Sequence, residues 1–159
     1  VLADGLVAAS RTRPDLIVDV ATLTGAIIVA LGHRHTGVMG DDDAVAAYLA
    51  AAERADELAW RLPLPAHMED ELDSPIADLQ NAKIGDTSGG SLFAGLFLQR
   101  FVGDTPWAHL DIAGTAWKGG AATGATGRPV GLLVHYLLER ATVSTVKPKH
   151  KTRSRKSVA

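Results

Sequence analysis

Hydrophobic and polar residues follow two periods along the chain, one typical of buried strands and one typical of amphipathic helices. Residues 15–21 (DLIVDVA) form a near-continuous apolar run of strand length, the pattern of a central strand covered on both faces. Residues 41–62 begin with acids suited to a helix N-terminus and continue through alanine-rich sequence, which predicts a helix of about four turns. A parallel sheet flanked by helices is therefore expected.

Apolar spacing and breaks at glycine or proline assign the other elements. Helices are predicted at residues 1–12, 26–32, 92–103 and 128–140, and strands at residues 35–40 and around 109–112. Residues 67–74 are interpreted as a short helix or turn, 76–82 as a short strand, and the glycine-rich segments 85–91 and 118–127 as a loop and a flexible connection. Because helices and strands alternate, the predicted class is α/β, a three-layer fold with helices on both faces of a mostly parallel or mixed central sheet.

The composition is that of a soluble globular protein, because 47% of the 159 residues are hydrophobic and can form a packed core. The length fits one domain or part of a larger one. The best apolar stretch is bounded by Gly25 and Gly32 and is too short to span a membrane. The absence of cysteine excludes disulfide scaffolds, thiolate metal sites and cysteine nucleophiles.

Charge is distributed unevenly along the chain. Residues 147–156 (KPKHKTRSRK) hold six of the sixteen Lys and Arg residues and no acid, so the rest of the chain is acidic. An acidic body is a poor general binder of nucleic acid, which leaves such binding open only to the basic tail. The alternative interpretation of the tail is a disordered, solvating terminus.

Two aspartates occupy positions where open α/β sheets build their sites. Asp19 lies near the end of the strand predicted at residues 15–21, and Asp111 has a similar place in AHLDIAG. Each could take part in chemistry, or could simply accept hydrogen bonds from loop amides. The second interpretation is favoured for a lone aspartate.

Other polar groups form no complete catalytic cluster. The pair His33 and His35 lacks a third metal ligand, and the acids at residues 41–43 lack the spacing of a calcium loop, so an exposed loop and helix capping explain them better. The loop 85–91 (GDTSGGS) could cradle phosphate or carry a nucleophile at Ser88 or Ser91, but it matches no phosphate-loop or nucleophile motif. Taken alone, the residues supply loops and apolar walls but no complete acid, base or metal site.

Several blocks of sequence together resemble one known family. These are VLADGL, DVATLTGA, TGVMG, WRLPL, SPIADLQN, SGGSLFAGLFLQRFV, WAHLDIAGTAW and GATGRPVGLLVHYLL, in this order. They are similar to the C-terminal half of the catalytic domain of a cytosol (leucyl) aminopeptidase, from Val1 to about Arg140. We therefore expect residues 1–142 to be part of such a domain and residues 143–159 to be a basic, disordered tail.

The resemblance implies a cytoplasmic metallo-exopeptidase that removes N-terminal residues from peptides. Enzymes of the family use two divalent ions, zinc or manganese, to hold and activate a bridging water, and they assemble as homohexamers. Their signature NTDAEGR, which contains metal ligands, stands immediately before the sequence that here begins VLADGL. All metal ligands and catalytic side chains are thus expected upstream of Val1, and the chain is expected to be a fragment that binds no metal and is inactive alone.

The resemblance carries over only a substrate-binding wall. Backbone groups at positions matching Leu23 and Gly25 hydrogen-bond the bound peptide in the family, and Thr22 adjoins them; a glycine at position 25 allows close approach of a substrate amide. Ala113 and Ala116 match positions that line the pocket for the N-terminal side chain. The position of Ala116 is often methionine in relatives, so alanine is expected to enlarge this pocket.

Two further hypotheses come from other functional classes. The chain could be a non-catalytic interaction module whose basic tail binds nucleic acid or an anionic partner. It could also be a nucleotide-binding α/β domain, although no phosphate-loop motif supports this.

Overall fold

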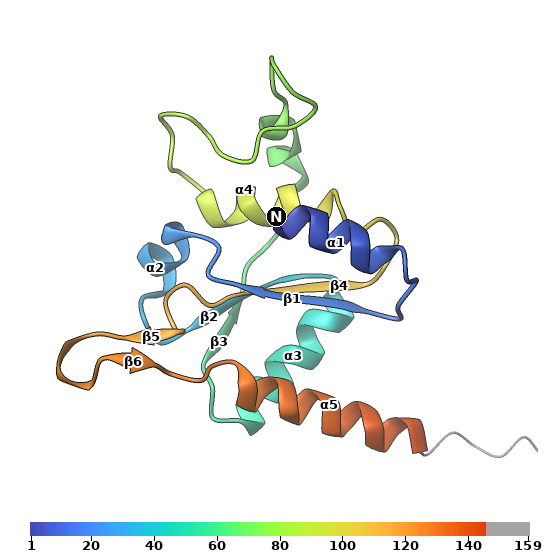
Figure 1. The fold of residues 1–159 in the computed structure, drawn as a ribbon, viewed down its shortest axis with the longest axis vertical. Helices are drawn as coiled ribbons and strands as arrows, with labels where there is room; N and C mark the ends of the chain where they lie inside the picture. The colour runs from blue at the N-terminus through green and yellow to red at the C-terminus, as the bar shows by residue number, and fades with distance from the viewer. Residues whose placement is uncertain (146–159) are drawn as a thin grey trace, which may run out of the picture.

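Helices cover both faces of a central sheet (Figure 1). A computed structural model describes residues 1–145, with side chains as far as Thr142. The helices are α1 (Leu2–Ser10), α2 (Gly25–Leu31), α3 (Asp42–Arg54), the short helix η1 (Ala66–Leu72), α4 (Gly90–Gln99), the short helix η2 (Gly120–Ala122) and α5 (Val130–Thr145). The strands are β1 (Ile17–Ala21), β2 (Thr36–Gly40), β3 (Ala59–Arg61), β4 (Trp107–Asp111), β5 (Trp117–Lys118) and β6 (Gly124–Ala125).

The central sheet is mixed, as expected from the sequence. Its four strands lie in the order β1-β4-β2-β3. β1 runs parallel to β4 and β2 parallel to β3, whereas β2 and β4 are antiparallel. The register aligns Asp19 with His109 and Ala21 with Asp111, so the two predicted aspartates lie on neighbouring strands. β5 and β6 form a separate antiparallel pair.

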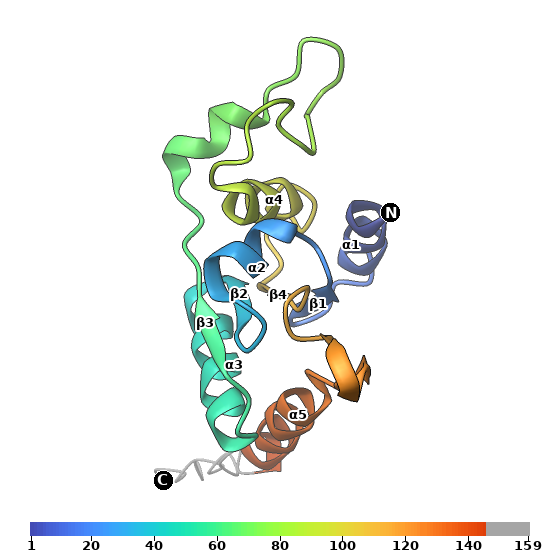
Figure 2. The same ribbon diagram turned by 90° about the vertical axis from the view of Figure 1, so that its left-hand side faces the viewer.

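One face of the sheet is covered by α3 and α5, as Figure 2 shows from the side. We call it the α3–α5 face. Val38, Ala108 and Leu110 of the sheet pack there against Tyr48 of α3 and Leu132 of α5, and all five are buried. Burial of these apolar side chains is the main stabilising contribution on this face.

The opposite face, which we call the α1–α4 face, lies under α1 and α4. Ile17 and Trp107 pack there against Leu6 of α1 and Leu98 of α4. Because side chains alternate along a strand, residues two apart share a face. The α1–α4 face therefore also carries the polar side chains that follow Ile17 and Trp107 at this spacing, namely Asp19, His109 and Asp111.

The helix predicted over residues 41–62 has about the expected four turns, since α3 has 13 residues, but it ends before the predicted segment does. α3 ends at Arg54, and Asp56 adopts a positive φ of 52° that breaks the helix. Residues 59–61 instead form β3, which pairs with β2. Tertiary strand pairing thus overrides the helical preference of the sequence after the turn.

Two other segments also differ from expectation. Residues 76–82 form no strand, since Ile76 is 94% exposed and the segment has no pairing partner in the described part of the chain. The connection predicted at residues 118–127 contains η2 and takes part in the β5–β6 pair. The remaining predicted helices and strands are confirmed, with shifted ends: α4 begins two residues earlier than expected, and α5 extends to Thr145.

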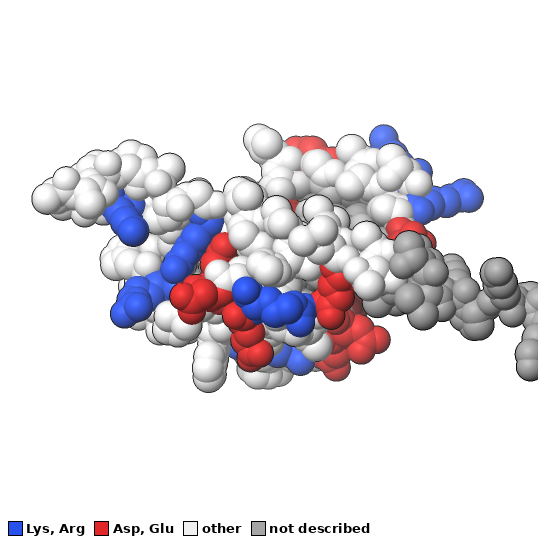
Figure 3. All heavy atoms as spheres, turned by 90° about the horizontal axis from the view of Figure 1, so that it is seen from below, with Lys and Arg blue, Asp and Glu red and all other residues white. Residues whose placement is uncertain are grey.

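Charged side chains of both signs are interspersed on the face seen in Figure 3. Arg54 of α3 pairs with Glu139 of α5, and Arg61 of β3 pairs with Asp42 of α3. The basic run at 147–156, on which the interaction-module hypothesis depends, lies outside the described residues. None of the helices in the described part of the chain has the length and apolar character needed to cross a membrane.

Candidate functional site

The loop that follows β1 is shaped by the cap of the next helix. Thr24 precedes α2 in an extended conformation, and its Oγ1 accepts a hydrogen bond of 3.1 Å from the Ile27 amide. Threonine at this position satisfies one of the amides that a helix N-terminus leaves unpaired. The cap fixes the point where the chain leaves the sheet, and with it the position of the loop.

Asp111 ties this loop to the end of β4. Its fully buried carboxylate accepts hydrogen bonds from the Leu23 amide at 3.1 Å and the Ala113 amide at 3.2 Å through Oδ1, and from Thr24 Oγ1 at 2.8 Å through Oδ2. The interpretation of Asp111 as an acceptor for loop amides is confirmed. The structure thereby brings Leu23 and Ala113, two predicted site residues from separate segments, to one carboxylate oxygen.

Two backbone groups of the loop remain available to a ligand. Within the described residues, the Leu23 carbonyl and the Gly25 amide have no hydrogen-bond partner. Gly25 is the first residue of α2, where a helix leaves its amides unpaired. An acceptor and a donor two residues apart suit the backbone of an extended peptide.

Leu23 and Gly25 border a cavity of about 1140 Å³. Leu23, Thr24 and Gly25 line one side of it, Val29 of α2 extends that side, and residues 86–94 line the other. Val29 is 90% exposed, so the wall is apolar and accessible. A cavity of this size, apolar with a few polar groups, suits a small peptide.

A lysine and an aspartate hold the loop opposite α2. The hydrogen bond to Glu71 raises the pKa of Lys83, and hydrogen bonds from Ser88 lower the pKa of Asp86. Lys83 Nζ lies 3.6 Å from Asp86 and also pairs with Glu71. Both shifts favour the charged forms that make this ion pair.

The other predicted substrate residues lie outside the cavity lining. Thr22 is exposed beside the loop, and Ala113 and Ala116 are half-buried in the turn after β4. The Ala116 amide donates to the Ile112 carbonyl at 2.9 Å. The turn packs tightly: a Cβ on Gly114 would lie 2.2 Å from the Gly32 carbonyl oxygen, so only glycine fits there.

Asp19 forms a separate buried network. Its Oδ2 accepts a 2.6 Å hydrogen bond from Trp107 Nε1, and its Oδ1 lies 2.5 Å from His109 Nδ1. His109 is fully buried, and its Nε2 has no protein partner in the described residues. Asp19 thus packs the α1–α4 face and contributes no group to the cavity.

The remaining candidates from the sequence are structural. Ser91 is buried and lies 2.9 Å from Thr24 Oγ1, which places it in the Asp111 network rather than beside a base. The acids at residues 41–43 were expected to cap the helix, but the side chain of Asp41 makes no cap hydrogen bond to α3. It accepts a hydrogen bond of 2.6 Å from the Trp107 amide instead. No group of three or more His, Asp or Glu side chains in the described chain could hold a metal ion, and His33 is exposed.

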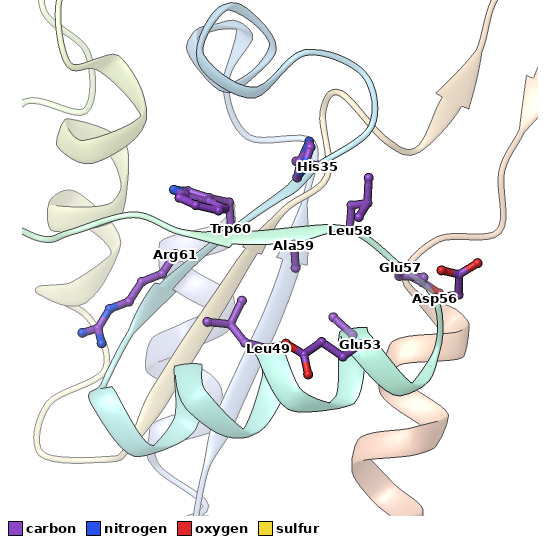
Figure 4. Close-up of a pocket in the computed structure, with 10 residues that line it drawn as sticks. His35, Leu49, Glu53, Asp56, Glu57, Leu58, Ala59, Trp60 and Arg61 are labelled. Carbon is purple, nitrogen blue, oxygen red and sulfur yellow. The ribbon is translucent and has the colours of Figure 1, made fainter.

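A second hollow of about 610 Å³ lies beside the edge strand β3 (Figure 4). His35 and Trp60 lie on one side of β3, and Leu49 and Glu53 of α3 on the other. It contains none of the predicted substrate-binding residues. The cavity beside Leu23 and Gly25 is therefore the better candidate site.

The sequence pattern suggested Ser91 only as a possible nucleophile and indicated no role for Thr24, although the two residues together join the walls of this site. Thr24 could have been recognised as a helix N-cap, because a threonine directly before a helix is a known signal. The bond between Thr24 and Ser91 joins residues 67 positions apart and has no local signal.

Comparison with known proteins assigns the family. The sequence model of the catalytic domain of the cytosol aminopeptidase family matches residues 1–134. A probable cytosol aminopeptidase of Acidovorax ebreus (strain TPSY) is 62% identical over 160 residues, which cover 100% of this chain and 32% of the relative. The probable cytosol aminopeptidase of Burkholderia mallei (strain SAVP1) is 56% identical over 142 residues, covering 89% of this chain and 28% of the relative.

A solved structure agrees with this assignment. A mutant of tomato leucine aminopeptidase superposes with a TM-score of 0.81 at 38% identity, covering 87% of this chain and 27% of that protein. The chain thus spans about a third of the length of the curated relatives it matches. It belongs to the cytosol aminopeptidase family.

Proposed function

We propose that the chain is the substrate-binding part of a metalloaminopeptidase that releases N-terminal amino acids from peptides. The observation that carries the proposal is the pair of unpartnered backbone groups, the Leu23 carbonyl and the Gly25 amide, at the rim of the large cavity. The names of the relatives, cytosol aminopeptidase and leucine aminopeptidase, support the reaction. They also support a cytoplasmic location, with assembly as a homohexamer proposed from the family resemblance.

The described residues do not fit two metal ions, because they include no suitable cluster of His, Asp and Glu side chains. We infer that two divalent ions, manganese or zinc, are held by residues in the part of the relatives that this chain does not cover. When bound, such ions supply an activated water and polarise the scissile carbonyl. This chain's own role is to bind and orient the peptide, and by itself it is expected to be inactive.

Within this role, the predicted residues form two groups. The Leu23 carbonyl and the Gly25 amide hold the peptide backbone beside Thr22. Ala113 and Ala116 border the space for the N-terminal side chain. Because Ala116 is small, this space is expected to accept residues larger than leucine.

The test is a chimera in which this chain replaces the matching third of the Acidovorax ebreus relative. We expect the chimera to hydrolyse leucine p-nitroanilide with added Mn²⁺, and the 159-residue chain alone not to do so. A folded chimera without activity, made from an active parent enzyme, would count against the proposed function.

Pocket size is tested in the same chimera with Ala116→Met. The longer side chain should fill the pocket and shift the preference from phenylalanine towards leucine substrates by about tenfold, the lower end of the effect of one methylene group in a hydrophobic pocket. An unchanged ratio of kcat/KM for the two substrates would remove Ala116 from the specificity pocket.

A further inference from the structure

Asp111 connects three parts of the candidate site that are far apart in the sequence. Its Oδ1 holds the Leu23 amide of the first loop and the Ala113 amide of the turn after β4. Its Oδ2 accepts from Thr24 Oγ1, which lies 2.9 Å from Ser91 Oγ at the start of α4. One carboxylate therefore joins both proposed substrate-binding segments and the helix that lines the far side of the cavity.

The direction of the hydrogen bonds within this network follows from its donors. A carboxylate only accepts, so the Thr24 hydroxyl donates its single hydrogen to Asp111. Thr24 Oγ1 then accepts from the Ile27 amide and from the Ser91 hydroxyl. The donor and the acceptor of each hydrogen bond from Ser91 through Thr24 to Asp111 are therefore fixed, which defines a single arrangement of the loop.

The carboxylate is an unusual choice if its only task is packing. Asp111 is 0% exposed, and no basic side chain pairs with it in the described part of the chain. A buried, unpaired charge is costly and persists only where hydrogen bonds compensate it. Here all three donors come from the two segments proposed to bind the substrate, so the bonds that offset the cost also hold these segments together.

The same hydrogen bonds flank the Leu23 carbonyl. Asp111 binds the Leu23 amide on one side of this carbonyl and the Thr24 hydroxyl on the other. Within the described residues this carbonyl has no hydrogen-bond partner, and Leu23 lines the cavity. A shift of about 1 Å in such a group can cost a hundredfold in rate.

We propose that Asp111 is a positioning residue, which holds the Leu23–Gly25 loop and the Ala113–Ala116 turn in the mutual register that a peptide substrate requires. This role rests on the proposed function of the site. Asp111 touches neither the substrate nor the reacting atoms, and acts through the two segments.

The experiment compares Asp111→Asn and Asp111→Ala in the active chimera with Asp19→Asn as the matched control. Asp19 is also a buried strand aspartate on the α1–α4 face, but within the described residues its hydrogen bonds go to Trp107 and His109 rather than to either segment. An asparagine at position 111 can still accept from the two amides, whereas its NH₂ group faces Thr24 and reverses the polarity of that bond. Alanine removes all three bonds.

We expect Asp111→Asn to lower kcat/KM for leucine p-nitroanilide at least tenfold, mainly through a higher KM, and Asp111→Ala to lower it further. A mere loss of folded enzyme would lower kcat and leave KM unchanged. Hydrogen exchange measured by mass spectrometry should speed up in peptides covering residues 22–25 and 113–116. In Asp19→Asn, kcat/KM should stay within threefold and exchange in these peptides should not change.

The proposal is overturned if Asp111→Asn leaves KM and exchange in both segments unchanged, or if Asp19→Asn reproduces its effects. Should Asp111→Ala fail to fold, the asparagine variant decides alone. An inactive unsubstituted chimera would instead refute the proposed function, and exchange in the two segments would still test the positioning role.

Discussion

The two faces of the central sheet differ in the aspartate and histidine side chains that they bury. The α3–α5 face packs Val38, Leu110 and Leu132 with the stacked rings of Tyr48 and Tyr136, whose centroids lie 4.1 Å apart. The α1–α4 face combines an apolar cluster with three buried polar side chains, Asp19, His109 and Asp111.

This difference indicates a division of tasks. Apolar packing stabilises the fold without fixing the direction of any hydrogen bond. Buried polar groups lower stability unless each one is paired, but their hydrogen bonds define one arrangement of the side chains. The cavity and the loop that borders it lie on the side with the polar groups. We infer that the α3–α5 face contributes most to stability. The α1–α4 face contributes less, because its buried polar groups serve to order the site.

The largest effect on stability is expected on the α3–α5 face. Leu132→Ala leaves a cavity in this core and should lower the free energy of unfolding by about 2–5 kcal/mol. Its control is Leu137→Ala on the same helix, where the side chain is 63% exposed and the change should stay within about 0.5 kcal/mol. Urea unfolding measures both, and equal losses would remove the claim that this face is the stabilising one.

Removing a polar group from the α1–α4 face should cost somewhat less. Asp19→Ala leaves the Trp107 indole N–H buried without an acceptor and deprives His109 of its partner, with an expected cost of about 2–3 kcal/mol. Asp15→Ala, an exposed aspartate just before β1, is the control and should change little. If Asp19→Ala were neutral in urea unfolding, the polar network would not be structurally required.

The cap of α2 is expected to contribute about 1–2 kcal/mol. Thr24→Val keeps the shape of the side chain but removes the acceptor for Ile27 and the donor to Asp111. Thr22→Val, in the same loop but exposed, should be nearly neutral for stability. Thermal unfolding measures the stability of both variants. Equal losses of stability would contradict a capping role for Thr24.

The smallest effect concerns pH and the α3–α5 face. Burial, with Tyr136 as the next cause, raises the pKa of Tyr48 above its ordinary value near 10. The folded state therefore holds the phenolic proton more tightly than the unfolded state does. The contribution of Tyr48 to the free energy of unfolding is complete below about pH 10 and is lost as the pH rises further. We expect the stability difference between the native chain and Tyr48→Phe to fall by less than about 1 kcal/mol up to pH 10.5. A difference that grows with pH would contradict the sign.

The sequence was a good guide where one face or both faces of an element are apolar over its whole length. The run LIVDVA predicted β1, and the acids before the alanine-rich segment predicted the start of α3. The pattern failed at residues 59–61, because β3 exists only through its pairing with β2. A strand that depends on a partner brought by tertiary folding has no strong local signal.

The site was predictable only in part, for a related reason. Leu23 and Gly25 were identified from the family resemblance, and the structure places both at the cavity. The bonds of Asp111 to the Leu23 amide, and of Asp19 to His109, join residues 88 and 90 positions apart. They depend on the register of β1 against β4, which no local pattern in either strand specifies.

The most direct test of the account is the metal content of the chain. After equilibrium dialysis against Mn²⁺ or Zn²⁺, the 159-residue polypeptide should retain no stoichiometric metal, whereas the chimera with the Acidovorax relative should retain two ions per chain and gain aminopeptidase activity. Two divalent ions held tightly by the polypeptide without the rest of the relative's sequence would contradict the claim that it contributes the peptide-binding backbone but not the metal ligands.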